Sequence, residues 1–129
     1  YSGAAASTCS DCDAGKYSGA TGATSEVTCS DCNAGKYSGA AALTCSDCDA
    51  GKYSGATGAT SEVTCSHCNA GKYSGAAAST CSDCYAGKYS GVTGATSEAT
   101  CSDCSAGKYS GVTGATNEAT CYECSAGKY

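Results

Sequence analysis

The chain is a tandem array of short blocks, and this repetition constrains its fold more than any other feature. Each block opens with Tyr-Ser-Gly and closes with Cys-x-x-Cys-x-Ala-Gly-Lys. Units this small fold by packing on their neighbours rather than alone. We therefore expect an extended linear tandem-repeat array. Its seven blocks occupy residues 1–16, 17–36, 37–52, 53–72, 73–88, 89–108 and 109–128, and Tyr129 opens the next.

The side chains available for a core are small. The 129 residues include 14 cysteines, 18 glycines and ten tyrosines, but no Phe, Trp, Met or Pro. Short chains so dense in cysteine are usually stabilised by disulfides formed in an oxidising, extracellular compartment. The composition therefore predicts a small disulfide-rich protein that is located outside the cell, on a cell surface or in a shed filament.

The block sequence predicts one β-hairpin, or an irregular version of one, per block and little or no helix. The first extended segment is predicted at Gly-Lys-Tyr-Ser, and the second just before the first cysteine of a pair, as at residues 62–65. Tyr, Val and Thr favour extended segments, whereas Gly and small polar residues favour turns. Blocks of 20 residues differ from blocks of 16 by four residues between these two segments, where loop tips tolerate insertions.

The run from Cys29 to Ser38, CSDCNAGKYS, resembles the ephrin-receptor-like cysteine-rich repeats of extracellular proteins. It is also similar to the smallest module of tumour-necrosis-factor receptors. In those families the cysteine before Gly-x-Tyr closes a loop with the next cysteine downstream. The resemblance therefore implies a ladder of six disulfides: Cys12 with Cys29, Cys32 with Cys45, Cys48 with Cys65, Cys68 with Cys81, Cys84 with Cys101, and Cys104 with Cys121.

Two cysteines are left over by this pairing. Cys9 has the position of a cysteine that closes a preceding loop, and Cys124 that of a cysteine that opens a following one. We therefore expect both to form disulfides between segments, so that the array continues head to tail into further copies of itself. Lateral contacts between copies would complete a filament.

Zinc is the competing chemistry, and cysteine spacing alone leaves it open. Cys9 and Cys12 with Cys29 and Cys32 have the spacing of a four-cysteine zinc site. However, seven cysteine pairs cannot be divided into four-ligand sites without leaving one pair over. We therefore favour disulfides and expect neither a metal nor another cofactor.

Several other function classes find little support in the residues. The net charge of −5 offers no basic patch for nucleic acid, and no apolar run approaches the roughly 20 residues of a membrane span. His67 is the only histidine and has no counterpart in the other blocks, so no catalytic group of serine, histidine and acid can recur. We do not expect an enzyme.

Threonines in the loops are candidates for O-glycosylation, because chains rich in Ser and Thr often form glycosylated stalks. The same residues also suit exposed loops without any modification. N-linked glycans are not expected, because no Asn-x-Ser/Thr sequence is present. The candidate O-glycan residues are Thr21, Thr24, Thr57, Thr60, Thr93, Thr96, Thr113 and Thr116.

Two functions remain after this comparison. A structural filament, fibril or stalk requires blocks that are nearly identical. A ligand-binding receptor or adhesin ectodomain would instead carry one distinctive block. Only His67, Tyr85 and Tyr122 interrupt the uniformity of the blocks. The sequence therefore favours the structural role.

Overall fold

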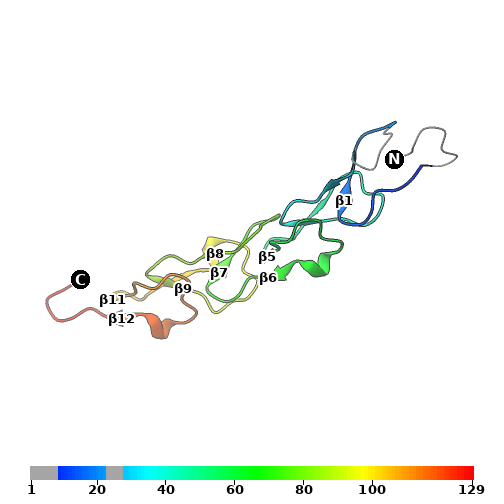
Figure 1. Cartoon of the computed structure of the whole chain (residues 1–129). Coiled ribbons are helices and arrows are strands. Elements are labelled where there is room, and N and C mark those ends of the chain that lie inside the picture. Colours follow the sequence, from blue (N-terminus) through cyan, green and yellow to red (C-terminus); the bar gives the residue numbers. More distant parts are fainter. Residues whose placement is uncertain (1–8, 23–27) are drawn as a thin grey trace.

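The computed structural model describes residues 9–22 and 28–129. These residues form an elongated row of small hairpins, and the chain passes along the row from one end to the other (Figure 1). The described part contains no α-helix. The fold is a disulfide-rich array of antiparallel β-hairpins, as the sequence predicts.

Every hairpin pairs a Lys-Tyr strand with the two residues that lie between a pair of cysteines. In the third hairpin, for example, Lys52 is opposite His67 and Tyr53 is opposite Ser66. Each hairpin is a separate two-stranded sheet. Within the described residues the pairs are β1 (Lys16–Tyr17) with β2 (Ser30–Asp31), β3 (Lys36–Tyr37) with β4 (Ser46–Asp47), β5 (Lys52–Tyr53) with β6 (Ser66–His67), β7 (Lys72–Tyr73) with β8 (Ser82–Asp83), β9 (Lys88–Tyr89) with β10 (Ser102–Asp103), and β11 (Lys108–Tyr109) with β12 (Tyr122–Glu123).

The position of the second strand differs from the sequence prediction. The residues before the first cysteine form short 3₁₀ turns in three long blocks, namely η2 (Glu62–Thr64), η3 (Glu98–Thr100) and η4 (Glu118–Thr120). In η2 the Cys65 N–H donates to the Glu62 carbonyl oxygen at 2.9 Å. Strand pairing begins only after Cys65, because the disulfide to Cys48 places the following residues opposite Lys52 and Tyr53.

A tight turn connects each cysteine pair to the next Lys-Tyr strand. The Lys52 N–H donates to the Asp49 carbonyl oxygen at 3.0 Å, and Gly51 between them has a φ of 86°. A positive φ at the third turn position is readily adopted by glycine. The Gly-Lys that ends every block is therefore a turn signal.

A second residue with positive φ lies in the loop of each block from the second to the seventh. Long blocks place glycine there, such as Gly58 with a φ of 69°, whereas short blocks place Ala41 and Ala77 there, with φ values of 60° and 59°. From Ala41 onward these residues donate their N–H to a cysteine carbonyl oxygen, as Gly58 does to Cys32 at 2.8 Å and Ala77 to Cys48 at 2.9 Å. Long and short loops therefore present the same backbone contact. The four extra residues of a long block divide into one before this position and three after it.

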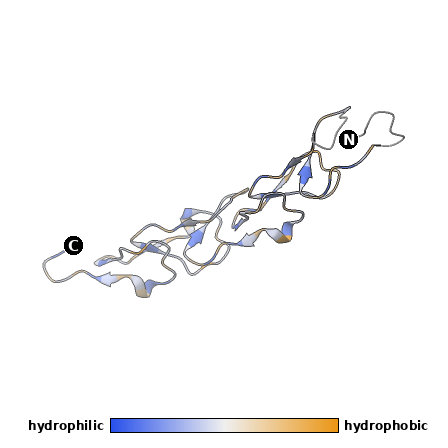
Figure 2. Ribbon diagram, in the orientation of Figure 1, coloured by the Kyte–Doolittle hydropathy of each residue, from blue (hydrophilic) through white to orange (hydrophobic). Residues whose placement is uncertain are grey.

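The core consists of disulfides and small side chains. Cys32, Cys48, Cys68 and Cys84 are fully buried, and Ala95 is 4% exposed. In contrast, the aliphatic side chains of Leu43 and Val63 are 75% and 90% exposed. Figure 2 accordingly shows polar and apolar stretches alternating along the ribbon rather than gathering in one region. Sulfur therefore occupies the place that large apolar side chains take in an ordinary core.

Candidate functional site

The feature that unites the described blocks is a ladder of six disulfides along the row. The structure joins the same cysteines that the resemblance implies, and the Cα atoms of each pair lie 5.7 to 5.9 Å apart. The sequence separations are 17 residues in long blocks and 13 in short blocks. The disulfides are Cys12–Cys29, Cys32–Cys45, Cys48–Cys65, Cys68–Cys81, Cys84–Cys101 and Cys104–Cys121.

These bonds exclude the zinc alternative for the cysteines concerned. A site built from Cys9, Cys12, Cys29 and Cys32 requires four thiolates, but Cys12 and Cys29 are bonded to each other and Cys32 is bonded to Cys45. Thiolates, and not disulfide sulfurs, are the cysteine ligands of zinc. No group of three or more His, Cys, Asp and Glu side chains gathers as a metal site in the residues that the structure describes.

Neighbouring blocks are joined by a repeated set of backbone hydrogen bonds. At one junction the Ser54 N–H donates to the Ala78 carbonyl oxygen at 3.1 Å. The N–H of Gly51, two residues before the block that contains Ser54, donates to the Ser74 carbonyl oxygen at 2.9 Å. The same contact at another junction runs from Gly15 to Ser38 and from Ser18 to Ala42. Backbone donors and acceptors are present whatever the side chains are, so the contact recurs along blocks that differ in sequence.

A buried serine strengthens the junctions made by short blocks. Ser74 is 4% exposed; its hydroxyl donates to the Lys52 carbonyl oxygen at 2.9 Å and accepts from the Gly51 N–H at 3.1 Å. Ser38 makes the same two contacts with Lys16 and Gly15. This role was not predicted from the sequence, although the serine follows tyrosine in every block.

The turn glycines also contact a block further along the row. A Cβ atom added to Gly51 would overlap the Gly94 carbonyl oxygen, and one added to Gly71 would overlap that of Gly114. A Cβ atom added to Gly107, whose φ of 83° is similar, would meet no atom within 4 Å. Close packing between blocks therefore requires glycine at Gly51 and Gly71.

Ion pairs line the outside of the hairpins. In hairpins with a short loop the lysine pairs with the aspartate opposite it, as Lys36 does with Asp47. In the hairpin that contains His67, histidine stands in place of that aspartate, and Lys52 pairs with Glu62 of η2 at 3.0 Å. Exposed pairs of this kind contribute about 0–1 kcal/mol each. They adjust the stability of a hairpin but do not determine the fold.

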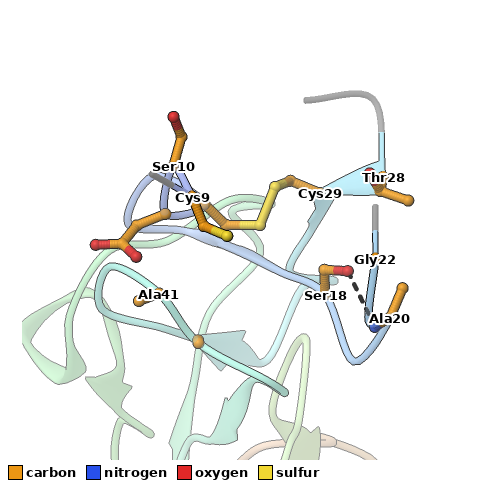
Figure 3. Close-up of a pocket in the computed structure, with 11 residues that line it drawn as sticks. Cys9, Ser10, Ser18, Ala20, Gly22, Thr28, Cys29 and Ala41 are labelled. Carbon is orange, nitrogen blue, oxygen red and sulfur yellow. Dashed lines mark hydrogen bonds between the residues drawn. A yellow bond between two sulfur atoms is a disulfide. The ribbon is translucent and has the colours of Figure 1, made fainter. Parts of the chain in front are cut away.

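The two leftover cysteines are free thiols, as the pairing implies. Cys9 is exposed and Cys124 is partly exposed, and they lie near opposite ends of the described chain. Figure 3 shows that Cys9 lines the same pocket as Cys29 and Ala41. On another side of this pocket the Ser18 hydroxyl accepts a hydrogen bond from the Ala20 N–H. Cys9 is therefore accessible to an incoming thiol.

The candidate glycosylation residues lie on the surface wherever the structure describes them. Each is exposed, and Thr24 lies outside the described residues. They fall on both sides of the buried contact residues Ala59, Ala95 and Ala115. The exposed candidates are Thr21, Thr57, Thr60, Thr93, Thr96, Thr113 and Thr116.

Comparison with protein families and with curated proteins gives no match. Across the described ranges, no helix is long and apolar enough to span a membrane. The disulfides are compatible with an extracellular or secreted protein. The structure thus supports a cysteine-rich tandem repeat.

Proposed function

We propose that this chain is a structural element of an extracellular filament, fibril or surface stalk. The observation that carries the proposal is the repeated junction, in which a serine N–H donates to an alanine carbonyl oxygen at five successive junctions, from Ser18 with Ala42 to Ser90 with Ala115. A contact made by backbone atoms can be repeated without limit, which a filament requires. The resemblance to ephrin-receptor-like repeats supports the extracellular location.

Growth of the filament would be head to tail. Cys9 and Cys124 are free in a chain whose other cysteines are all paired. A disulfide from Cys124 of one copy to Cys9 of the next would extend the ladder with the same connectivity. Oxidation of the two thiols by molecular oxygen or a disulfide donor forms the S–S bond and transfers two electrons and two protons to the oxidant.

Non-reducing electrophoresis and electron microscopy of the 129-residue chain test this function. We expect a ladder of covalent multiples of 12.4 kDa that collapses to the monomer on reduction, and filaments with a repeating axial unit. The matched control is the double variant Cys9→Ser/Cys124→Ser, which retains all six internal disulfides and should remain a monomer on the gel. A wild-type chain that remains monomeric under oxidising conditions and forms no filament would contradict the proposal.

We also propose that the exposed loop threonines carry O-linked glycans. Their support is exposure, because every one of these side chains that the structure describes is exposed to solvent. The intact mass of native material should exceed 12.4 kDa by multiples of a sugar residue, and β-elimination should remove the excess. A native mass equal to the sequence mass would exclude these glycans.

An alternative role as a ligand-binding ectodomain has one supporting observation. Tyr109 and Tyr122 are 56% and 59% exposed, and their ring centroids lie 6.1 Å apart. Exposed tyrosines are enriched among residues that contribute most to protein–protein binding. In this role the pair would contact a protein ligand, and Tyr109→Ala/Tyr122→Ala would abolish ligand binding while leaving self-assembly intact. Under the filament proposal the same variant should self-assemble as the wild-type chain does, and no binding of a separate protein ligand is expected for either chain.

A further inference from the structure

The disulfides connect into one covalent path along the row. Cys29 is bonded upstream to Cys12, and Cys32, three residues later, is bonded downstream to Cys45. The same arrangement recurs in every later Cys-x-x-Cys segment up to Cys104, which is bonded to Cys121. A pulling force applied to the two ends can therefore pass from disulfide to disulfide through these short segments. The five linking segments are residues 29–32, 45–48, 65–68, 81–84 and 101–104.

This path has little slack. The two residues inside each linking segment form a β-strand, as in β4 (Ser46–Asp47) and β8 (Ser82–Asp83). A strand is already close to the full extension of the backbone, at about 3.3 Å per residue. Each disulfide adds a fixed span of 5.7 to 5.9 Å between Cα atoms. Only reorientation at the disulfides can lengthen the path further.

The hairpin loops lie outside this path. Each disulfide bypasses 17 residue steps in a long block or 13 in a short one, and the bypassed segment includes the Lys-Tyr strand and the loop residue with positive φ. Four loops of 17 and two of 13 contain 94 of the 109 residue steps between Cys12 and Cys121. A force applied at the chain ends cannot extend the residues inside these loops while the disulfides are intact.

We propose that the disulfide ladder carries tensile force along this chain, and that it makes each chain a nearly inextensible tether whose loops are sheltered from tension. The proposal rests on the proposed function insofar as a filament or stalk has to resist pulling. The force path itself is a property of the single chain. In the Cys48–Cys65 and Cys84–Cys101 disulfides both cysteines are buried, which shields these two bonds from reductants in solution.

The covalent connectivity sets the maximum length. Without disulfides, the 109 steps from Cys12 to Cys121 could extend to roughly 380 Å at about 3.5 Å per residue. With the ladder intact, 15 steps in the linking segments and six disulfide spans give a limit of about 85 Å. The ladder thus lowers the maximum extension between these residues about fourfold.

Single-molecule force spectroscopy tests the proposal on the full 129-residue chain held by handles at both ends. The oxidised chain should stop lengthening near the limit set by the ladder. Complete reduction with dithiothreitol should then release roughly 300 Å of additional contour length. An oxidised chain that releases hidden length on this scale before its handles detach would overturn the proposal.

Two matched double variants measure the path one disulfide at a time. Cys48→Ser/Cys65→Ser opens a loop of 17 residues and should release about 55 Å, whereas Cys32→Ser/Cys45→Ser opens a loop of 13 and should release about 40 Å. Covalent connectivity sets these lengths, so the readout holds even for a variant that folds poorly. Equal increments, or no increment, would contradict the proposed path.

The outcome is separable from that of the proposed function. If the oxidised chain stops at the extension limit but forms no filament, the proposed filament function is contradicted and the proposed force path is not. Chains that form filaments yet lengthen without loss of disulfides would contradict the force path alone.

Discussion

Gly51→Ala is expected to destabilise the array by about 2–5 kcal/mol. The alanine must adopt a φ near 86°, which costs about 1–2 kcal/mol for a residue with a Cβ atom. The Cβ atom would also overlap the Gly94 carbonyl oxygen of a block further along the row, and overpacking of this kind costs about 1–3 kcal/mol. Urea denaturation followed by tyrosine fluorescence measures the change, because the chain has ten tyrosines and no tryptophan.

Gly107→Ala is the matched control for this prediction. Its turn has the same φ and the same hydrogen bond, from the Lys108 N–H to the Ser105 carbonyl oxygen at 3.0 Å, but nothing lies within 4 Å of the added Cβ atom. It should therefore cost only the backbone term of about 1–2 kcal/mol. An equal loss of unfolding free energy in the two variants would show that contact between blocks contributes nothing at Gly51.

Reduction of the six disulfides is expected to unfold the chain completely. A disulfide that closes a loop of this size contributes about 3 kcal/mol, so six contribute on the order of 18 kcal/mol, more than the roughly 5–15 kcal/mol total stability of an ordinary domain. The core offers no replacement, since it consists mainly of cysteine and alanine. Loss of the near-ultraviolet circular dichroism of tyrosine, together with a rise from two to 14 alkylatable thiols, measures the transition.

Cys9→Ser/Cys124→Ser provides the control for reduction. This variant lacks only the two free thiols and should keep its ordered signal until the six disulfides are reduced. A fully reduced chain that retained the native dichroism would contradict the prediction. Recovery of that signal on adding zinc to the reduced chain would instead support a metal-binding array.

Much of the local structure could be predicted from the block sequence. Lys and Tyr of the predicted Gly-Lys-Tyr-Ser segment form the first strand, as in β3 (Lys36–Tyr37), whereas its glycine lies in the tight turn before the strand. The strand could be predicted because its signal lies within a few neighbouring residues. The cysteine partners required the resemblance to known repeats, because spacing alone also permits zinc.

The second strand could not be located in this way. Val63 and its neighbours have strand-forming side chains but form η2, and pairing falls on Ser66 and His67. The disulfide from Cys48 to Cys65 fixes this register. A covalent bond between residues 17 apart thus outweighs the local preference.

What the sequence determined by itself is the repeat, its dependence on cysteine and the first half of each hairpin, because all three depend on neighbouring residues. The tertiary structure alone decided how blocks contact one another. Ala77 adopts a left-handed φ that alanine rarely takes, and Gly51 packs against Gly94. Both result from contacts between blocks, in which atoms more than 20 residues apart share one small space that no local pattern records.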